Sequence, residues 1–268
     1  MRTRKSLGQH FLMHRLIAER IAIVAGLSPH SVVLEIGPGT GMLTRQLLQR
    51  AKKVIAVEAD RGLFERLQKE FEADIAEGRL MLTHADIRTF SLSALPKGYA
   101  LVANIPYYLT GEIFRMFLAS DNQPSAMTLL VQKEVAARIA RAKKESILSL
   151  SVKAYGTPKY EFTVPRGAFK PSPGVDSAVL TVRDISRKHF ATKEQERRFF
   201  ELLHAGFAHK RKFVRNNLSD AGLSAGGIPA KSRAEDLPLA VWLALSKVEG
   251  LSLARLDSPS SARRAKNA

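Results

Sequence analysis

Residues 104–107, Asn-Ile-Pro-Tyr, place an amide oxygen, a proline carbonyl and an aromatic ring within one short segment. The two oxygens can accept both hydrogens of an exocyclic amine, while the ring stacks on a planar base. An Asn-x-Pro segment taken alone is more often an ordinary turn after a strand. Its chemistry therefore depends on which residues lie beside it.

A glycine turn, Gly37-Pro38-Gly39-Thr40-Gly41, follows an apolar, β-branched run. The spacing is G-x-G-x-G with a proline inside it, whereas a dinucleotide-binding dehydrogenase needs G-x-G-x-x-G and free N–H groups for a pyrophosphate. S-adenosylmethionine has no phosphate, and nearby acids suit its sulfonium. We therefore favour this methyl donor, although the glycines alone would also fit a plain strand-to-helix turn.

The elements that position these segments alternate along the chain. Strands are expected at residues 32–36, 54–57, 79–83, 99–103 and 127–131. Amphipathic helices are expected at residues 42–48, 60–71, 110–119, 133–142 and 147–154. This alternation predicts an α/β fold with a parallel sheet covered by helices on both faces. Two later runs, 161–164 and 178–182, are expected to complete the sheet as a hairpin.

Polar residues follow the first four expected strands. Gly37 follows the first strand, Glu58 the second, Asp86 the third and Asn104 the fourth. The carboxyl ends of parallel strands share one edge of a sheet, where ligands of such folds bind. Glu58 lies 21 residues beyond Gly37, a spacing that suits a carboxylate accepting hydrogen bonds from ribose hydroxyls.

Four motifs occur in a fixed order: Leu7–Leu12, Glu35–Gly41, residues 104–107 and Phe169–Val179. In this combination the chain resembles the ribosomal RNA adenine dimethyltransferase family over most of residues 5–220. It is similar above all to the members that dimethylate two adjacent adenines near the 3′ end of small-subunit (16S) rRNA. Members that modify an adenine of large-subunit rRNA and confer antibiotic resistance share these motifs and are the near alternative.

The resemblance implies a class I, Rossmann-like methyltransferase sheet and S-adenosyl-L-methionine as methyl donor. The cofactor-binding residues that it implies are His10, Leu12, Gly37, Gly39, Glu58, Asp86 and Asn104. In this interpretation Gly37 lies against the methionine part, Glu58 binds the ribose and Asp86 meets the adenine amine. His10 stands where asparagine is common in the family, a change that a backbone contact tolerates.

Asn104, Pro106 and Tyr107 are the expected catalytic residues. The lone pair of an adenine N6 amine is delocalised into the ring, so the amine is a poor nucleophile. Hydrogen bonds from its N–H groups to the Asn104 side-chain oxygen and the Pro106 carbonyl would favour a pyramidal nitrogen. Tyr107 would stack on a flipped-out base. The resemblance implies Phe169 for the opposite face, although this aromatic residue would also suit the core.

The charge of the chain indicates a polyanionic partner. Lys and Arg number 42 against 25 Asp and Glu, for a formal charge of +17. Nucleic acid is favoured over an anionic membrane because no amphipathic anchor stands out. Cysteine is absent, which excludes disulfides and thiolate metal sites, and no histidine cluster has metal-ligand spacing, so no metal is expected. Without an apolar span or secretion signal, we expect a cytoplasmic protein with no membrane association.

The pattern changes to helices alone after about Asp184. We expect an S-adenosylmethionine-binding domain at 1–184, of which 1–30 form an N-terminal arm and helix. A small C-terminal α-helical domain at 185–250 is expected to bind rRNA, and 251–268 to form a flexible basic tail. Helices are expected within it at residues 194–209, 212–221 and 237–248. The residues expected to contact RNA phosphates are Lys210, Arg211, Lys212 and Arg215.

The sequence thus favours a monomeric enzyme acting on small-subunit rRNA within the 30S pre-ribosomal particle. A rival from another class is a non-catalytic assembly or transcription factor built on the same fold.

Overall fold

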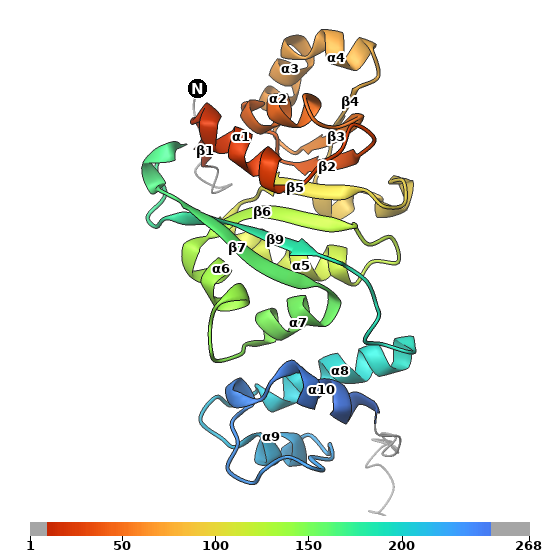
Figure 1. Cartoon of the computed structure of the whole chain (residues 1–268), viewed down its shortest axis with the longest axis vertical. Coiled ribbons are helices and arrows are strands. Elements are labelled where there is room, and N and C mark those ends of the chain that lie inside the picture. Colours follow the sequence, from red (N-terminus) through yellow and green to blue (C-terminus); the bar gives the residue numbers. More distant parts are fainter. Residues whose placement is uncertain (1–9, 248–268) are drawn as a thin grey trace, which may run out of the picture. The chain divides into compact units, whose positions relative to one another are not determined.

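The computed structural model describes residues 10–247, and the chain divides into two compact units, Met1–Ala191 and Thr192–Ala268. The first unit is built on a seven-stranded sheet with the order β4-β3-β2-β5-β6-β9-β7 (Figure 1). Its strands are β2 (Val32–Ile36), β3 (Lys53–Glu58), β4 (Leu80–His84), β5 (Ala100–Asn104), β6 (Ala126–Gln132), β7 (Thr157–Val164) and β9 (Ser177–Arg183).

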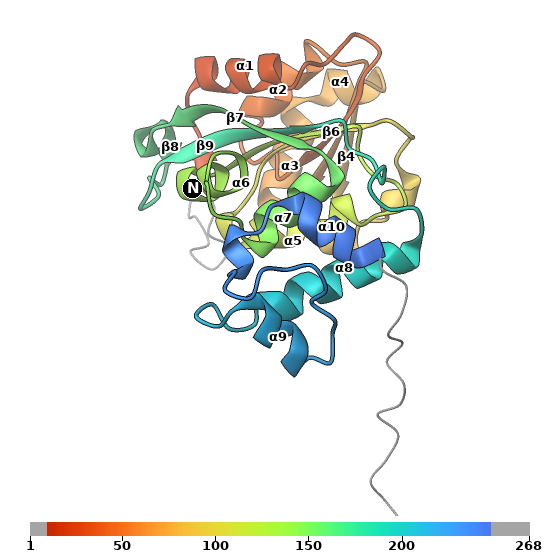
Figure 2. The same cartoon turned by 60° about the horizontal axis from the view of Figure 1, so that its bottom comes forward.

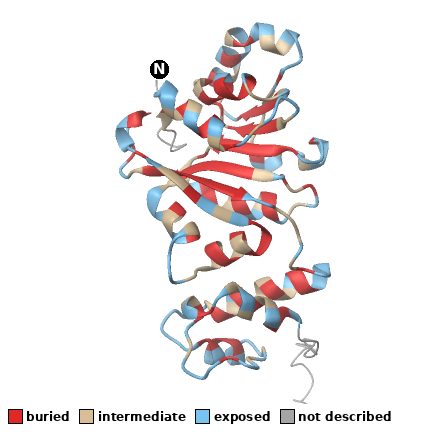
Figure 3. Ribbon diagram, in the orientation of Figure 1, coloured by how far each residue is buried: buried red, intermediate tan, exposed pale blue. Residues whose placement is uncertain are grey.

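Strands β2 to β6 are parallel to one another, and β9 runs antiparallel to both β6 and β7. The strands near the centre are buried on both faces, which explains why they read as continuous apolar runs (Figure 3). The chain order reverses across the sheet between β2 and β5. Such a reversal opens a crevice beyond the carboxyl ends of the strands.

Helices cover both faces of this sheet. Helices α1 (Arg15–Val24) and α2 (Met42–Leu48) lie on one face, and α5 (Thr110–Leu118) and α7 (Ile147–Tyr155) lie on the other (Figure 2). The remaining helices of this unit are α3 (Arg61–Glu70), α4 (Glu72–Ala76) and α6 (Lys133–Ala140). The predicted fold class, a Rossmann-like sheet with helices on both faces, is confirmed.

A small second sheet joins distant parts of the sequence. Strand β1 (Phe11–Leu12) pairs antiparallel with β8 (Phe169–Lys170), so that Leu12 lies opposite Phe169. The backbone N–H of Met13 also donates to the carbonyl of Ala168, 2.9 Å away. The sequence did not indicate this pairing, because a strand of two residues has no periodicity to detect.

The division between the units lies after the predicted boundary at residue 184, because residues 185–191 are attached to the first unit. The Ser186 N–H donates to the Tyr155 carbonyl at 2.9 Å, and the Phe190 ring meets the Tyr155 ring edge-on at 5.6 Å. The Arg187 guanidinium donates to the carbonyls of Ala119 and Ser120, at 2.6 and 3.0 Å. These contacts place the division at residues 191 and 192.

The second unit consists of helices α8 (Lys193–Gly206), α9 (Val214–Asp220) and α10 (Leu239–Lys247), with a short 3₁₀ turn before α10. Trp242 is fully buried and stacks on Phe207 with ring centroids 5.7 Å apart. Helix α8 ends earlier than predicted, where the Asn217 side-chain amide donates to the carbonyls of Gly206 and His209. The predicted tail at 251–268 lies outside the described residues.

Within residues 10–247, no helix has both the length and the apolar composition needed to cross a membrane.

Candidate active site

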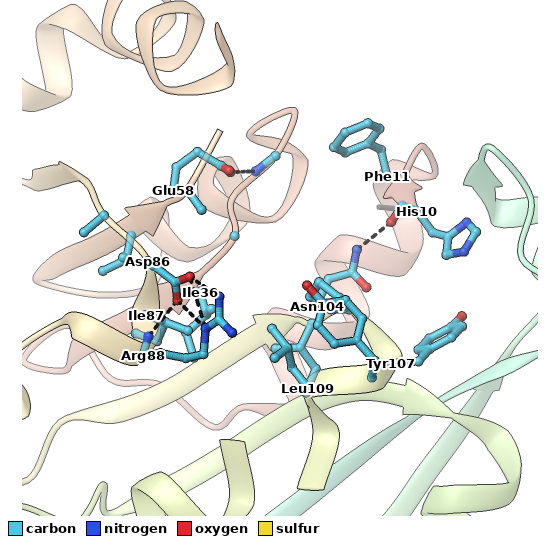
Figure 4. A pocket seen from close by; sticks show the side chains of 18 residues that line it. His10, Phe11, Ile36, Glu58, Asp86, Ile87, Arg88, Asn104, Tyr107 and Leu109 are labelled. Atoms are coloured by element: carbon cyan, nitrogen blue, oxygen red, sulfur yellow. Dashed lines mark hydrogen bonds and ion pairs between the residues drawn. The ribbon is translucent and has the colours of Figure 1, made fainter. Parts of the chain in front are cut away.

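A pocket opens beyond the carboxyl ends of β2, β3 and β5, beside the N-terminal strand β1 (Figure 4). It brings together predicted site residues from five separate segments: His10, Gly37, Gly39, Glu58, Asp86, Asn104, Pro106 and Tyr107. Leu12 is buried and lines a smaller adjoining cavity with Pro38. The sheet therefore gathers these residues as the strand order predicts.

The glycine turn leaves space above its backbone. Gly37 has φ +64°, and a side-chain carbon added there would have no neighbour within 4 Å. Gly39 has φ +61°, and a side-chain carbon there would lie 3.0 Å from the Phe11 ring. The open surface at Gly37 fits the amino-acid end of S-adenosylmethionine, while Phe11 covers Gly39. Phe11 was not predicted as a site residue.

Glu58 fixes the shape of this turn. Its Oε2 accepts a hydrogen bond from the Gly39 N–H at 3.0 Å, and its Oε1 accepts one from the Asp60 N–H at 2.9 Å. Burial raises the pKa of the Glu58 carboxyl, and the two backbone N–H groups oppose that rise. Each carboxylate oxygen can accept a second hydrogen bond, so the group fits the predicted contact with ribose hydroxyls.

Asp86 is engaged by a residue that the sequence reasoning missed. The Arg88 guanidinium donates hydrogen bonds to both oxygens of the Asp86 carboxylate, with Nη2–Oδ2 and Nε–Oδ1 distances of 2.5 and 3.0 Å (Figure 4). Hydrogen bonding from Arg88 lowers the pKa of the Asp86 carboxyl, which keeps it ionised as an acceptor. The pair lies on an exposed part of the rim. An arginine two residues after an acid is too common a pattern to mark a site.

The side chain of Asn104 is held in one orientation. Its Nδ2 donates to the backbone carbonyl of His10 at 3.0 Å (Figure 4). A carbonyl can only accept, so this bond identifies the nitrogen end of the amide and directs Oδ1 away from His10. Within the described range, Oδ1 has no hydrogen-bond partner. It is therefore available as an acceptor.

A 3₁₀ turn, Tyr107–Leu109, follows β5, and Pro106 is its N-cap residue. The Pro106 carbonyl accepts the Leu109 N–H at 3.0 Å and retains one lone pair for a second donor. The Tyr107 hydroxyl lies 2.7 Å from Oγ of Ser177, and the Tyr107 ring lies 5.8 Å from the His10 ring at an interplanar angle of 27°. Tyr107 is therefore anchored at its hydroxyl end.

The structure places Phe169 outside this pocket. Its side chain is 5% exposed and packs in the core with Leu12 instead of lining the pocket. The reason is the pairing of β1 with β8, which places Phe169 directly opposite Leu12. This burial agrees with the core interpretation of Phe169, while its contact with the target base stays a prediction.

His10 contributes its side chain as well as its backbone. Nδ1 of His10 donates to the Pro171 carbonyl at 2.8 Å, because a carbonyl oxygen can only accept. The ring thus links the pocket to the proline-rich loop that follows β8. The sequence interpretation considered only a backbone contact.

Glu35 is a buried acid of β2, two residues before Gly37. It is 1% exposed, and burial raises its pKa to about 8, with the charge of Glu58 adding to the rise. At neutral pH its carboxyl is therefore largely protonated. Glu35 was recognised as part of the motif, but no role was predicted for it.

The basic residues predicted to contact RNA lie in the second unit. Lys210, Arg211 and Lys212 form the exposed turn between α8 and α9, and Arg215 is exposed in α9. Lys212 also pairs with Asp220 at 3.0 Å. Within residues 10–247, no group of three or more His, Asp or Glu side chains is arranged to hold a metal ion.

A family model and several sequence relatives match most of the chain. The family model described as ribosomal RNA adenine dimethylase matches residues 1–248. A ribosomal RNA small subunit methyltransferase A from Dehalococcoides mccartyi is 39% identical over 262 residues, covering 92% of this chain and 89% of the relative. The enzyme of the same name from Deinococcus radiodurans is 36% identical over 259 residues, covering 92% and 86%.

Two crystal structures share the fold over most of the chain. The 23S rRNA methyltransferase ErmE is 26% identical with a TM-score of 0.72, covering 88% of this chain and 98% of ErmE. A dimethyladenosine transferase from Plasmodium falciparum is 26% identical with a TM-score of 0.73, covering 88% and 96%. The chain therefore belongs to the ribosomal RNA adenine dimethylase family of S-adenosylmethionine-dependent methyltransferases.

Proposed function

We propose that the chain dimethylates N6 of two adjacent adenines in the 3′-terminal hairpin of small-subunit (16S) rRNA. It would act as a monomer in the cytoplasm, on the 30S pre-ribosomal particle during subunit maturation. The main support is the orientation of the Asn104 amide. Its Nδ2 donates to the His10 carbonyl, which leaves Oδ1 available to accept a hydrogen bond from the target amine. The small-subunit methyltransferase A relatives support the choice of RNA.

The proposed cofactor-binding residues lie in and beside this pocket. Gly37 would lie against the methionine part of S-adenosylmethionine, while Glu58 and Asp86 would accept hydrogen bonds from the ribose hydroxyls and the adenine amine. His10 and Leu12 would close the N-terminal side. When bound, the donor supplies an electrophilic methyl group on a sulfonium.

Asn104 and Pro106 would activate the target by orienting it. Oδ1 of Asn104 and the free lone pair of the Pro106 carbonyl would each accept one N–H of the adenine amine. Both acceptors then favour a pyramidal nitrogen, whose lone pair is no longer spread into the ring. Positioning of this kind contributes up to about 7–11 kcal/mol in well-oriented reactions.

Tyr107 would hold the flipped-out purine by stacking, a contact worth about 1–3 kcal/mol per base in single-strand binders. The exposed cations Lys210, Arg211, Lys212 and Arg215 would contact the RNA backbone and supply affinity without reading sequence. Tyr107 would therefore place the target base for the reaction, and the exposed cations would bind the rest of the RNA.

The test is incubation of the purified chain and labelled S-adenosylmethionine with ribosomal subunits from cells lacking this chain. We expect dimethyladenosine in 16S rRNA by mass spectrometry, and none in large-subunit rRNA. Label in the large subunit would instead favour the resistance-type alternative, whose fold ErmE shares. No label in either subunit, with binding to the particle retained, would favour a non-catalytic assembly factor.

A further inference from the structure

Ser177 contacts Tyr107, the predicted stacking residue, and does not itself line the pocket. Its Oγ lies 2.7 Å from the Tyr107 hydroxyl, and its side chain is fully buried. Ser177 begins β9, where it pairs with Gln132 of β6 on one side and Val164 of β7 on the other. It therefore stands in a rigid part of the sheet, whereas Tyr107 stands in the turn after β5.

The residues just before Ser177 have hydrogen bonds of their own to other parts of the chain. The Asp176 carbonyl accepts the Lys133 N–H at 3.0 Å, and Oδ1 of Asp176 accepts the Arg166 N–H at 3.1 Å. At the other end of the same segment, the Pro171 carbonyl accepts Nδ1 of His10, whose ring lies against Tyr107. Residues 171–177 thus constrain Tyr107 in two ways. Ser177 forms a hydrogen bond with its hydroxyl, and Pro171 accepts one from the His10 ring that lies against it.

We propose that Ser177 is a positioning residue for methyl transfer, which fixes the direction in which the Tyr107 ring points through the hydroxyl hydrogen bond. This inference rests on the proposed function, in which that ring stacks on the target purine. A ring held at its hydroxyl cannot swing about its Cα–Cβ bond, and the adjacent His10 ring limits its rotation about Cβ–Cγ. The stacking surface is therefore in place before the base arrives. The residue that orients Tyr107 then governs how well the amine meets Asn104.

The bond is suited to persist during catalysis. Burial raises the pKa of the Tyr107 hydroxyl, so that it stays protonated throughout the neutral range. Whichever hydroxyl donates, the pair stays neutral, and removal of one partner leaves a buried polar group without its bond. Removal of both partners costs less than the two single losses together.

The experiment measures kcat and KM for unmethylated small subunits with the wild type, Ser177→Ala, Tyr107→Phe and the double variant. Tyr107→Phe keeps the ring and removes only the hydroxyl. Each single change is expected to lower kcat by about 3- to 10-fold, the scale of one hydrogen bond, with KM for the particle changed less. The double variant is expected to be no slower than either single variant.

A matched control comes from β7, where the Tyr160 hydroxyl lies 2.6 Å from Oγ1 of Thr163. This is the same kind of bond in the same unit, but neither residue lines the pocket. Tyr160→Phe and Thr163→Ala are expected to lower the thermal unfolding temperature and to leave kcat unchanged. The control separates positioning from a general loss of stability.

Two results would overturn the inference: wild-type kcat in Ser177→Ala, or a double variant whose loss is the product of the two single losses. Tyr107→Leu removes the ring and separates this inference from the proposed function. If Tyr107→Leu is slow but Ser177→Ala is not, the inference alone fails. If Tyr107→Leu keeps wild-type kcat, the stacking role fails, and the inference fails with it.

Discussion

The side-chain nitrogen of Asn104 lies 3.0 Å from the backbone carbonyl oxygen of His10, which joins the end of β5 to the residue before β1. This bond makes the N-terminal segment part of the site, because it determines which end of the amide faces the target. The same segment pairs with β8 and covers Gly39 with Phe11. The acceptor geometry therefore depends on residues from four distant parts of the sequence.

Asn104→Asp tests this orientation directly. The carboxylate is nearly the same size as the amide but cannot donate to the His10 carbonyl, so it would be repelled from its present position. We expect kcat/KM for small subunits to fall by about 100-fold or more, the scale of losing one preorganised polar contact in an active site. Asn104→Ala should lose at least as much. A variant of either kind with wild-type kcat/KM would contradict the assigned role.

The sequence indicated Gly37, Glu58, Asp86 and Asn104 because each ends or closely follows a strand, and parallel strands end at one edge. This information is local to each strand and its neighbouring turn. The cap of α3 is equally local, since the Asp60 side chain accepts the Leu63 N–H at 3.0 Å. Such features depend on residues only a few positions apart.

The remaining features of the site depend on contacts between distant residues. Ser177 meets Tyr107 across a separation of 70 residues, and Nδ1 of His10 meets the Pro171 carbonyl across 161. The burial of Phe169 depends on a contact of the same kind, its pairing with Leu12. No periodicity within either segment indicates these contacts.

Glu58→Gln is expected to weaken binding of S-adenosylmethionine by about 10-fold, on the scale of one charge-assisted hydrogen bond. The glutamine oxygen can replace one carboxylate oxygen, but its NH₂ group cannot accept the second backbone N–H from Gly39 or Asp60. Isothermal titration calorimetry with the free protein measures the change.

Glu72→Gln is the control for Glu58, because it removes the same charge at an exposed position of α4. Its affinity for the donor should match that of the wild type. Equal affinities for Glu58→Gln and Glu72→Gln would show that Glu58 does not shape the donor site.

Glu35 should make the free energy of unfolding depend on pH. Its pKa rises from 4.5 to about 8 on burial. Between these values the unfolded chain loses the proton that the folded chain keeps, so stability falls as pH rises through this window and levels off above it. Glu35→Gln removes the effect. Relative to the wild type, the variant should gain about 1–4 kcal/mol on going from pH 5 to pH 8, by denaturant titration.

The control for Glu35 is Glu134→Gln, which removes an exposed carboxyl of α6. It should leave the difference in unfolding free energy between pH 5 and pH 8 close to that of the wild type. A Glu35→Gln variant with the same pH dependence as the wild type would mean that Glu35 ionises normally in the fold.

Lys210→Ala and Arg211→Ala test whether the exposed turn between α8 and α9 contacts RNA phosphates. Each phosphate contact releases bound counterions, so the logarithm of affinity falls linearly with the logarithm of salt concentration. Removing one contact should reduce that slope by about one and weaken binding to the particle. Lys69→Ala removes an exposed positive charge from α3 and serves as the matched control. The Lys69 variant measures the effect of losing one positive charge away from the turn. If the Lys210 and Arg211 variants have the same salt slope as the Lys69 variant, the turn does not contact RNA phosphates.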